Sequence, residues 1–152
     1  MSIEERLKEL NLVIPDPPEP VANFVPCRTA GKLVFISGQG PVINNLPVHM
    51  GKLGKEISLE DGYEAARLCA LNLLSQLKNK ISDWNQLKKI VSVRGFVAST
   101  ENFYDQPKVV NGCSDLLCDI FGDRGIHARC ALGVNVLPGN IPVEVEMVVE
   151  LC

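Results

Sequence analysis

Hydrophobic residues recur every three or four positions in residues 2–10, 58–80 and 105–121 of the chain. This spacing places them along one face of an α-helix. A proline-rich run at residues 15–20 follows the first segment and must be extended, because proline lacks the backbone N–H that a helix interior uses. The pattern therefore predicts one short helix and two long amphipathic helices.

The ends of the long helices are marked by residues that favour helix termini. Ser58, with Asp61 three residues later, forms a variant of the capping box. Asp105 is expected to cap the other long helix through its side chain, with Pro107 in the first turn. Gly122 follows the last turn of that helix, where glycine is favoured.

Five segments rich in β-branched and aromatic residues are predicted to be strands: residues 21–25, 32–37, 89–97, 128–136 and 142–151. The third segment is apolar on both of its faces, which is typical of a strand in the middle of a sheet. A Leu-Pro-Gly-Asn turn separates the last two, so we expect them to pair as a hairpin.

In chain order the main elements read β-β-α-β-α-β-β. Two strand-helix-strand crossovers predict an α+β fold in which a mixed sheet carries two helices on one face. Residues 40–58 form a long connection of the kind that often covers a site. The other sheet face also needs a cover, and a second copy of the same sheet would provide it, so we expect a homo-oligomer.

The composition of the 152 residues, 46% hydrophobic and 22% charged, is that of one soluble globular domain. Fifteen Lys and Arg against eighteen Asp and Glu give a net charge of −3, which disfavours nucleic acid as a partner. No window approaches the length of a membrane span, and residues 1–6 lack the features of a signal peptide. We therefore expect a cytoplasmic protein with no membrane partner.

None of the six cysteines belongs to a C-x-x-C pair. We expect Cys69, Cys113 and Cys130, which lie in apolar segments, to be small buried hydrophobic residues. Cys113 and Cys118 lie five apart on a predicted helix and diverge around it, so no metal site is expected.

Arg129 is the first candidate for chemistry. In its predicted strand it shares one face with Ala131 and Gly133, whose small size leaves room beside it. A guanidinium matches a carboxylate with two parallel hydrogen bonds, so Arg129 is a candidate substrate anchor; a solvated or ion-paired arginine is the alternative.

Glu144 and Glu146 share one face of the next predicted strand. As hairpin neighbours of the Arg129 strand, one of them is expected to reach the face that carries Arg129, where a carboxylate could orient or deprotonate a water. The alternative, which we favour for Glu146, is the solvent side of an edge strand.

Three other residues are weaker candidates. Ser37 and Gly38 end a predicted core strand with small residues, which lets a ligand approach the backbone. Asn111 is a poor helix former inside a predicted helix, so it either faces a site or is exposed to water. His127, like His49, stands in no pattern that suggests a catalytic triad, which disfavours a serine or cysteine hydrolase.

The C-terminal motif resembles that of the reactive intermediate deaminase (RidA, YjgF) family. It reads Ala128-Arg129-x-Ala131-x-Gly133-Val134-x-x-Leu137-Pro138 and then Val143-Glu144-Val145-Glu146, and Ser37-Gly38-Gln39 and the Asn111 helix fit the same family. The likeness covers about residues 21–151, which leaves 1–20 as an N-terminal extension of a single domain, 1–152. It implies a chorismate-mutase-like homotrimer with three clefts between subunits, which hydrolyses 2-imino or enamino acids to 2-oxo acids and ammonia.

The resemblance also implies roles for individual residues. Arg129 would hold the substrate carboxylate, and Glu144 would help to place the attacking water. Ser37 and Gly38 would line the cleft, and Asn111 would lie near its rim.

Two further substrate-binding positions depart from the family pattern. Phe24 stands where the deaminases commonly have tyrosine, and Ala131 where many have cysteine. No cofactor is expected, because an iminium carbon is already a strong electrophile. We therefore expect an imine or enamine deaminase. A non-catalytic sensor or chaperone-like trimer that binds small carboxylates is the alternative, and the endoribonuclease label that the family has carried fits the negative charge poorly.

Overall fold

A computed structural model describes all 152 residues and shows one five-stranded mixed sheet in the order β1-β2-β7-β5-β6. β1 and β2 are each antiparallel to their neighbours, β7 is antiparallel to β5, and β5 is parallel to β6. The strands of this sheet are β1 (Cys27–Ala30), β2 (Leu33–Gln39), β5 (Leu87–Ala98), β6 (Ala128–Val134) and β7 (Val143–Leu151). The helices are α1 (Ile3–Glu9), α2 (Leu59–Lys80) and α3 (Gln106–Phe121), with short 3-10 turns η1 (Trp84–Gln86), η2 (Gly122–Gly125) and η3 (Pro138–Asn140).

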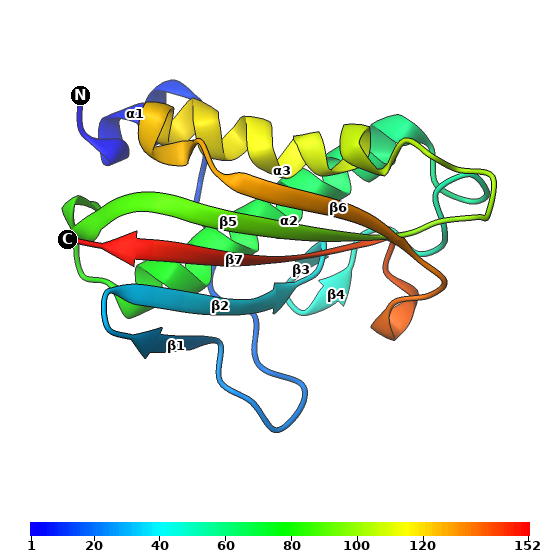
Figure 1. Cartoon of the computed structure of the whole chain (residues 1–152), viewed down its shortest axis with the longest axis horizontal. Helices are drawn as coiled ribbons and strands as arrows, with labels where there is room; N and C mark the ends of the chain where they lie inside the picture. Colours follow the sequence, from blue (N-terminus) through cyan, green and yellow to red (C-terminus); the bar gives the residue numbers. More distant parts are fainter.

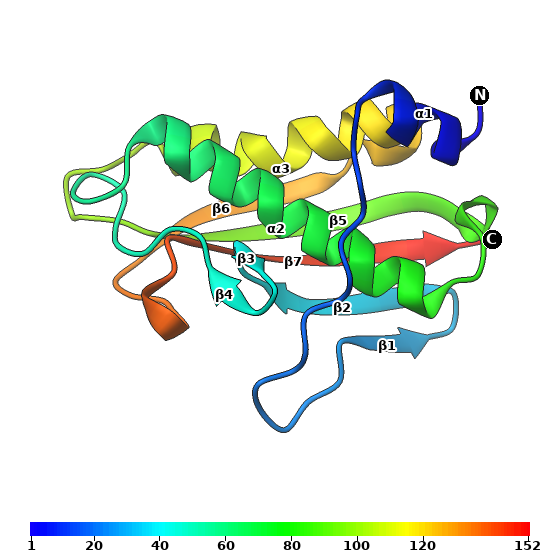
Figure 2. The same ribbon diagram turned by 180° about the vertical axis from the view of Figure 1, so that it is seen from behind.

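Both long helices cover the same face of the sheet, as the sequence predicted (Figures 1 and 2). Ser58 caps α2, since its side chain accepts the backbone N–H of Asp61, and Gly122 with φ of 57° ends α3. The two helices approach closely at Gly112, where an added Cβ would overlap the carbonyl of Tyr63. Asp105 begins α3 without the predicted side-chain cap, and its carboxylate instead lies 3.4 Å from the amine of Lys108.

The face of each strand residue follows from the register. Val93 of β5 is paired with both Arg129 and Met147, and Val93 and Met147 are buried under the helices. Phe96 is paired with both Leu132 and Glu144, which therefore lie on the open face of the sheet. Paired residues on neighbouring strands point to the same side.

Two expectations about the strands were wrong. Residues 21–25 form no strand, because Pro26 has no N–H to donate and β2 bulges between Ile36 and Gln39, so pairing with β2 begins only at Cys27. β6 and β7 do not pair as a hairpin, because β5 lies between them. As a result β7 is central and is not an edge strand.

The long connection after β2 contains a small hairpin that the sequence did not predict. β3 (Val42–Ile43) and β4 (Leu46–Pro47) are joined by Asn44 and Asn45, which both have positive φ, at 50° and 63°. Two left-handed residues in succession form the turn that suits a two-residue hairpin, and asparagine tolerates this conformation.

The extended segment after α1 crosses α2 as a strap, defined here as residues 15–20 (Figure 2). Buried polar side chains of α2 hold it: Ser75 Oγ donates to the carbonyl of Pro15 at 2.6 Å, and Gln76 Nε2 donates to the carbonyl of Pro18 at 2.8 Å. On its other side, the N–H of Glu19 donates to Asn45 Oδ1 at 3.1 Å. The strap is therefore fastened between α2 and the β3–β4 hairpin.

Cys69 and Cys113 are buried as predicted, but Cys130 is exposed. It lies on the edge strand β6, and its side chain points to the open face because Arg129 and Ala131 on either side point to the helices. No helix of the structure is both long and apolar enough to cross a membrane.

Candidate functional site

Arg129 is held by α3 from the neighbouring strand β6. Its Nη1 donates to Asn111 Oδ1 at 2.8 Å and to Ser114 Oγ at 3.2 Å, and its Nη2 lies 3.4 Å from the carbonyl of Pro107. Asn111 and Ser114 are one helical turn apart and so present their side chains on the same face of α3. The arginine is thus fixed in the groove between a strand and a helix, half-buried.

These hydrogen bonds leave part of the guanidinium free. Nε has no partner in the chain, and Nη2, which makes one long hydrogen bond, has a second N–H to donate. A carboxylate can accept both in parallel. Arg129 is therefore oriented as a fork with two open donors.

Behind Arg129, Ser114 and His127 continue the hydrogen-bond network. His127 Nδ1 lies 2.6 Å from the carbonyl of Gly125 and must donate to it, which leaves Nε2 to accept the Ser114 hydroxyl at 2.9 Å. Burial lowers the pKa of His127, and the nearby positive charge of Arg129 lowers it further. A neutral imidazole therefore orients Ser114, which in turn accepts from Arg129.

The contact between His127 and Ser114 was not predicted from the sequence. The spacing of these residues could have indicated it. His127 precedes Arg129 by two residues in extended chain, and Ser114 follows Asn111 by three residues on the helix. Both pairs share a face at these spacings. The partner that completes the group is the carbonyl of Gly125 and not a carboxylate.

Glu144 does not reach the Arg129 face, contrary to the prediction from the supposed hairpin. Arg129 points toward the helices, Glu144 points to the open face, and β5 lies between their strands. Glu146 lies on the same open face as Glu144 and forms an ion pair with Arg94 at 3.3 Å. Within one chain, Arg129 and Glu144 therefore belong to different sites.

The carboxylate of Glu144 lies against the bulge in β2. A Cβ added to Gly38 would lie 3.0 Å from Glu144 Cδ, so only glycine gives the carboxylate this room. Partial burial raises the pKa of Glu144 above its ordinary value, and the neighbouring charge of Glu146 raises it further. A carboxyl group with a raised pKa can accept and release a proton nearer neutral pH.

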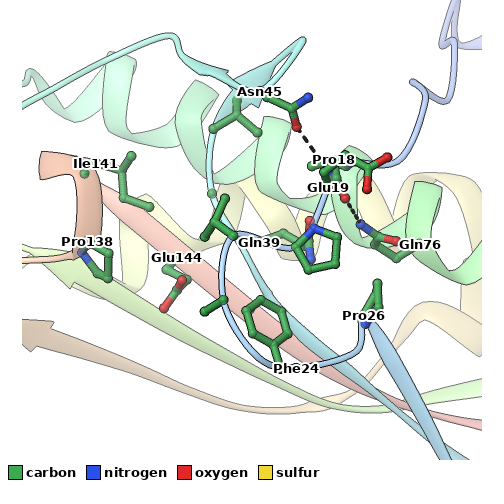
Figure 3. A pocket seen from close by; sticks show the side chains of 17 residues that line it. Pro18, Glu19, Phe24, Pro26, Gln39, Asn45, Gln76, Pro138, Ile141 and Glu144 are labelled. Carbon is green, nitrogen blue, oxygen red and sulfur yellow. Dashed lines mark hydrogen bonds between the residues drawn. The ribbon is translucent and has the colours of Figure 1, made fainter.

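One pocket of about 440 Å³ is lined by Glu144, Gly38 and Phe24 (Figure 3). The strap and the loop of residues 21–26 that follows it form one side of this pocket. Ser37 does not line this pocket. Its hydroxyl donates to the carbonyl of Val25 at 2.7 Å and so holds the loop that carries Phe24.

The predicted site residues thus form two groups. Arg129 and Asn111 are in contact at the groove between β6 and α3, and Ala131 follows Arg129 on the same face of β6 and packs against the core. Phe24, Gly38 and Glu144 line the pocket on the other side of the molecule. No three His, Cys, Asp or Glu side chains lie close enough together to hold a metal ion.

Residues 4–151 match the family described as YjgF/chorismate mutase-like, putative endoribonuclease. Protein TCP17 of Trypanosoma cruzi is 37% identical over 150 residues, which cover 98% of this chain and 94% of that protein.

Solved structures agree with this match. The protein Atu1372 of Agrobacterium tumefaciens superimposes with a TM-score of 0.92 at 37% identity, covering 99% of this chain and 92% of that one. A putative endoribonuclease of Shewanella oneidensis gives a TM-score of 0.96 at 31% identity, covering 99% and 100%. TdcF of E. coli, solved with bound serine, shares the fold with a TM-score of 0.63 at 18% identity, covering 88% and 92%. The chain belongs to the YjgF/chorismate mutase-like family.

Proposed function

We propose that this protein is a homotrimeric deaminase that hydrolyses 2-imino or enamino acids to 2-oxo acids and ammonia. Arg129 of one subunit, with Asn111 and Ser114 that hold it, would face the pocket that contains Glu144 of the neighbouring subunit. Each of the three clefts between subunits would then contain one Arg129 and one Glu144. The observation that supports this arrangement best is that Arg129 and Glu144 lie on opposite faces of the sheet in one chain. A site that needs both groups is incomplete without a second copy.

Arg129 would bind the carboxylate of the substrate. Its two free N–H groups form a fork for which a carboxylate is the matching ligand. Asn111 and Ser114 hold the guanidinium in place before the ligand arrives, which lowers the entropy cost of binding.

Glu144 would orient a water molecule for attack on the imine carbon and take up its proton. Attack of water on the iminium carbon forms a C–O bond and breaks the C=N π bond, and one water proton passes through the carboxyl group to the nitrogen. When the C–N bond then breaks and the C=O bond forms, ammonia leaves and the carboxylate takes up the hydroxyl proton of the tetrahedral intermediate. The raised pKa of Glu144 suits a group that both accepts and donates a proton. The protein would need only to position acid, water and base around carbon that is already electrophilic.

A coupled assay tests the proposal. An amino-acid oxidase generates imino acids in solution, and the rate of 2-oxo acid release is followed with and without the protein. The proposal requires faster release with the wild-type protein. An unchanged rate for every imino acid, from a preparation of trimeric mass, would reject the deaminase.

The second candidate is a trimer that binds small carboxylates without turnover. Phe24 favours it, because this residue lines the Glu144 pocket and has no hydroxyl to contribute to proton transfer. Binding of small carboxylates with no acceleration in the coupled assay would identify this function. The protein would be cytoplasmic in either case.

A further inference from the structure

The pocket beside Glu144 is large and mostly lined by carbon. Its volume of about 440 Å³ compares with roughly 150 Å³ for an engineered cavity that binds benzene. Nine of the seventeen residues that line it have side chains of carbon and hydrogen alone, and four of these are prolines. The methyl group of an alanine-derived imine would leave most of this space empty.

The polar side chains of the pocket are largely engaged with backbone atoms. Gln76 Nε2 donates to the carbonyl of Pro18, and Asn45 Oδ1 accepts from the N–H of Glu19 (Figure 3). Gln39 Nε2 donates to the carbonyl of Ser37 at 3.2 Å. Each of these hydrogen bonds uses one group of an amide and fixes the orientation of its side chain, so the polar part of the lining is confined to a few set positions.

The charges of the pocket are negative. Glu19 and Glu144 are its only ionisable residues. A substrate carboxylate would be repelled here, which directs it to Arg129, and an acidic side chain would be repelled as well. The part of the substrate that enters this pocket is therefore not anionic, and the hydrocarbon side chains that make up most of the lining favour an apolar group.

The strap makes this wall rigid. Pro18 and Pro20 have fixed backbone angles, and the segment is hydrogen-bonded to both α2 and the β3–β4 hairpin. A preformed apolar wall binds apolar groups without the cost of ordering a loop.

We infer that the substrates of this protein are 2-imino acids with bulky apolar side chains, of the kind derived from leucine or phenylalanine, and that residues 18–26 select them. This inference rests on the proposed function, since it takes Glu144 as the group beside the reacting carbon. The substrate would lie with its carboxylate on Arg129 of one subunit and its side chain in the Glu144 pocket of the next.

Binding of stable 2-oxo acids tests the selection separately from turnover. Calorimetry with the wild-type trimer would compare pyruvate, 4-methyl-2-oxopentanoate, 2-oxoglutarate and a 2-oxo acid with a cationic side chain. We expect 4-methyl-2-oxopentanoate to bind tighter than pyruvate by roughly tenfold to sixtyfold, since each of its three additional carbons contributes up to about fourfold when it is fully buried. 2-Oxoglutarate should bind more weakly than 4-methyl-2-oxopentanoate because of its second carboxylate.

A pair of variants locates the selecting wall. Ala22 lines the pocket and its neighbour Asn23 does not, although both are exposed. Ala22→Phe should weaken binding of 4-methyl-2-oxopentanoate by at least about tenfold and that of pyruvate much less, because the added ring fills the pocket. Asn23→Phe is the matched control and should leave both affinities unchanged.

The outcomes separate the two proposals. Equal affinity across the series, or tighter binding of pyruvate or of an oxo acid with a cationic side chain, would overturn the apolar selection even if imino acids are hydrolysed. The expected order of affinities without turnover of any imino acid would support the selection and reject the deaminase.

Discussion

At the residue scale, the geometry of Arg129 makes its replacement by lysine informative. Arg129→Lys keeps the charge but loses the fork, so it should already lower kcat/KM on imino acids. Arg129→Ala should lower kcat/KM by roughly tenfold to a few hundredfold, the range that charge-assisted hydrogen bonds supply. Steady-state kinetics measure both effects, and light scattering checks the mass. Wild-type rates in Arg129→Ala would remove this residue from the site, and a dissociated variant would show that it is structural.

Glu144→Gln should separate activity from stability. The substitution should lower kcat by removing the proton acceptor. It should also raise the Tm at pH 7, because a partly buried carboxylate with a raised pKa is destabilising once it is charged.

The effect of Glu144→Gln on the Tm should depend on pH. Below the unfolded-state pKa of about 4.3, Glu144 is protonated in both states, so the stability that it contributes is fully present. That contribution is lost as pH rises through the raised folded-state pKa. The Tm advantage of Glu144→Gln should therefore be absent near pH 4 and present at pH 7 in differential scanning fluorimetry. A Tm advantage of equal size at both pH values would contradict the assignment of this effect to the charge of Glu144. For the effect on kcat, Glu146→Gln is the control.

Residues whose neighbours are local could be predicted from the sequence. Arg129 was a candidate because strand periodicity places it beside small residues on one face, and Asn111 because it is a poor helix former inside a predicted helix. The relation of Arg129 to Glu144 could not be predicted, because it depends on β5 entering between two strands that are consecutive in the chain. Ser114 and His127 were missed because neither is unusual where it stands, and only their contact gives them a role.

At the scale of elements, the crossing of α2 and α3 depends on Gly112. In an unconstrained helix, Gly→Ala would be stabilising by about 1 kcal/mol. Gly112→Ala should instead be destabilising by about 1 to 3 kcal/mol, because its Cβ would overlap the carbonyl of Tyr63 and separate the helices. Thermal or urea unfolding measures the change, and its sign is the test, since increased stability would mean that the helices do not pack this closely.

The same helix carries Asn111 and Ser114, so a displaced α3 should also loosen Arg129. The helices themselves were predictable because their caps and periodicity are local. The strand at 21–25 was not, because β-branched residues there fit a strand equally well, while the actual boundary is set by Pro26 and by a bulge in another strand. The β3–β4 hairpin was missed because two successive asparagines are a weaker turn signal than Asn-Gly.

At the scale of the whole molecule, the open face of the sheet is the surface that we expect to be covered in the trimer. Phe35 and Leu132 project from it with 47% and 46% of their surface exposed in the single chain, and Phe96 lies between them in the sheet. Light scattering at micromolar concentration should give a mass near three times 16.6 kDa.

Leu132→Glu should dissociate this assembly, because it places a charge in a face that the trimer would desolvate. Its far-ultraviolet circular dichroism should remain that of the wild type, since the residue makes no part of the core between sheet and helices. A monomeric wild type, or a trimer that survives Leu132→Glu, would count against the open face as the interface.

The opposite orientations of Arg129 and Glu144 have a consequence for mixed assemblies. If each cleft takes its arginine from one subunit and its glutamate from the next, then subunits with Arg129→Ala and subunits with Glu144→Gln can complement each other. Any trimer that contains both kinds has one cleft with both residues intact, so unfolding and refolding an equal mixture should restore about a quarter of the wild-type activity. Two proteins of low activity would together form a more active assembly, and a cleft built within one subunit could not do this.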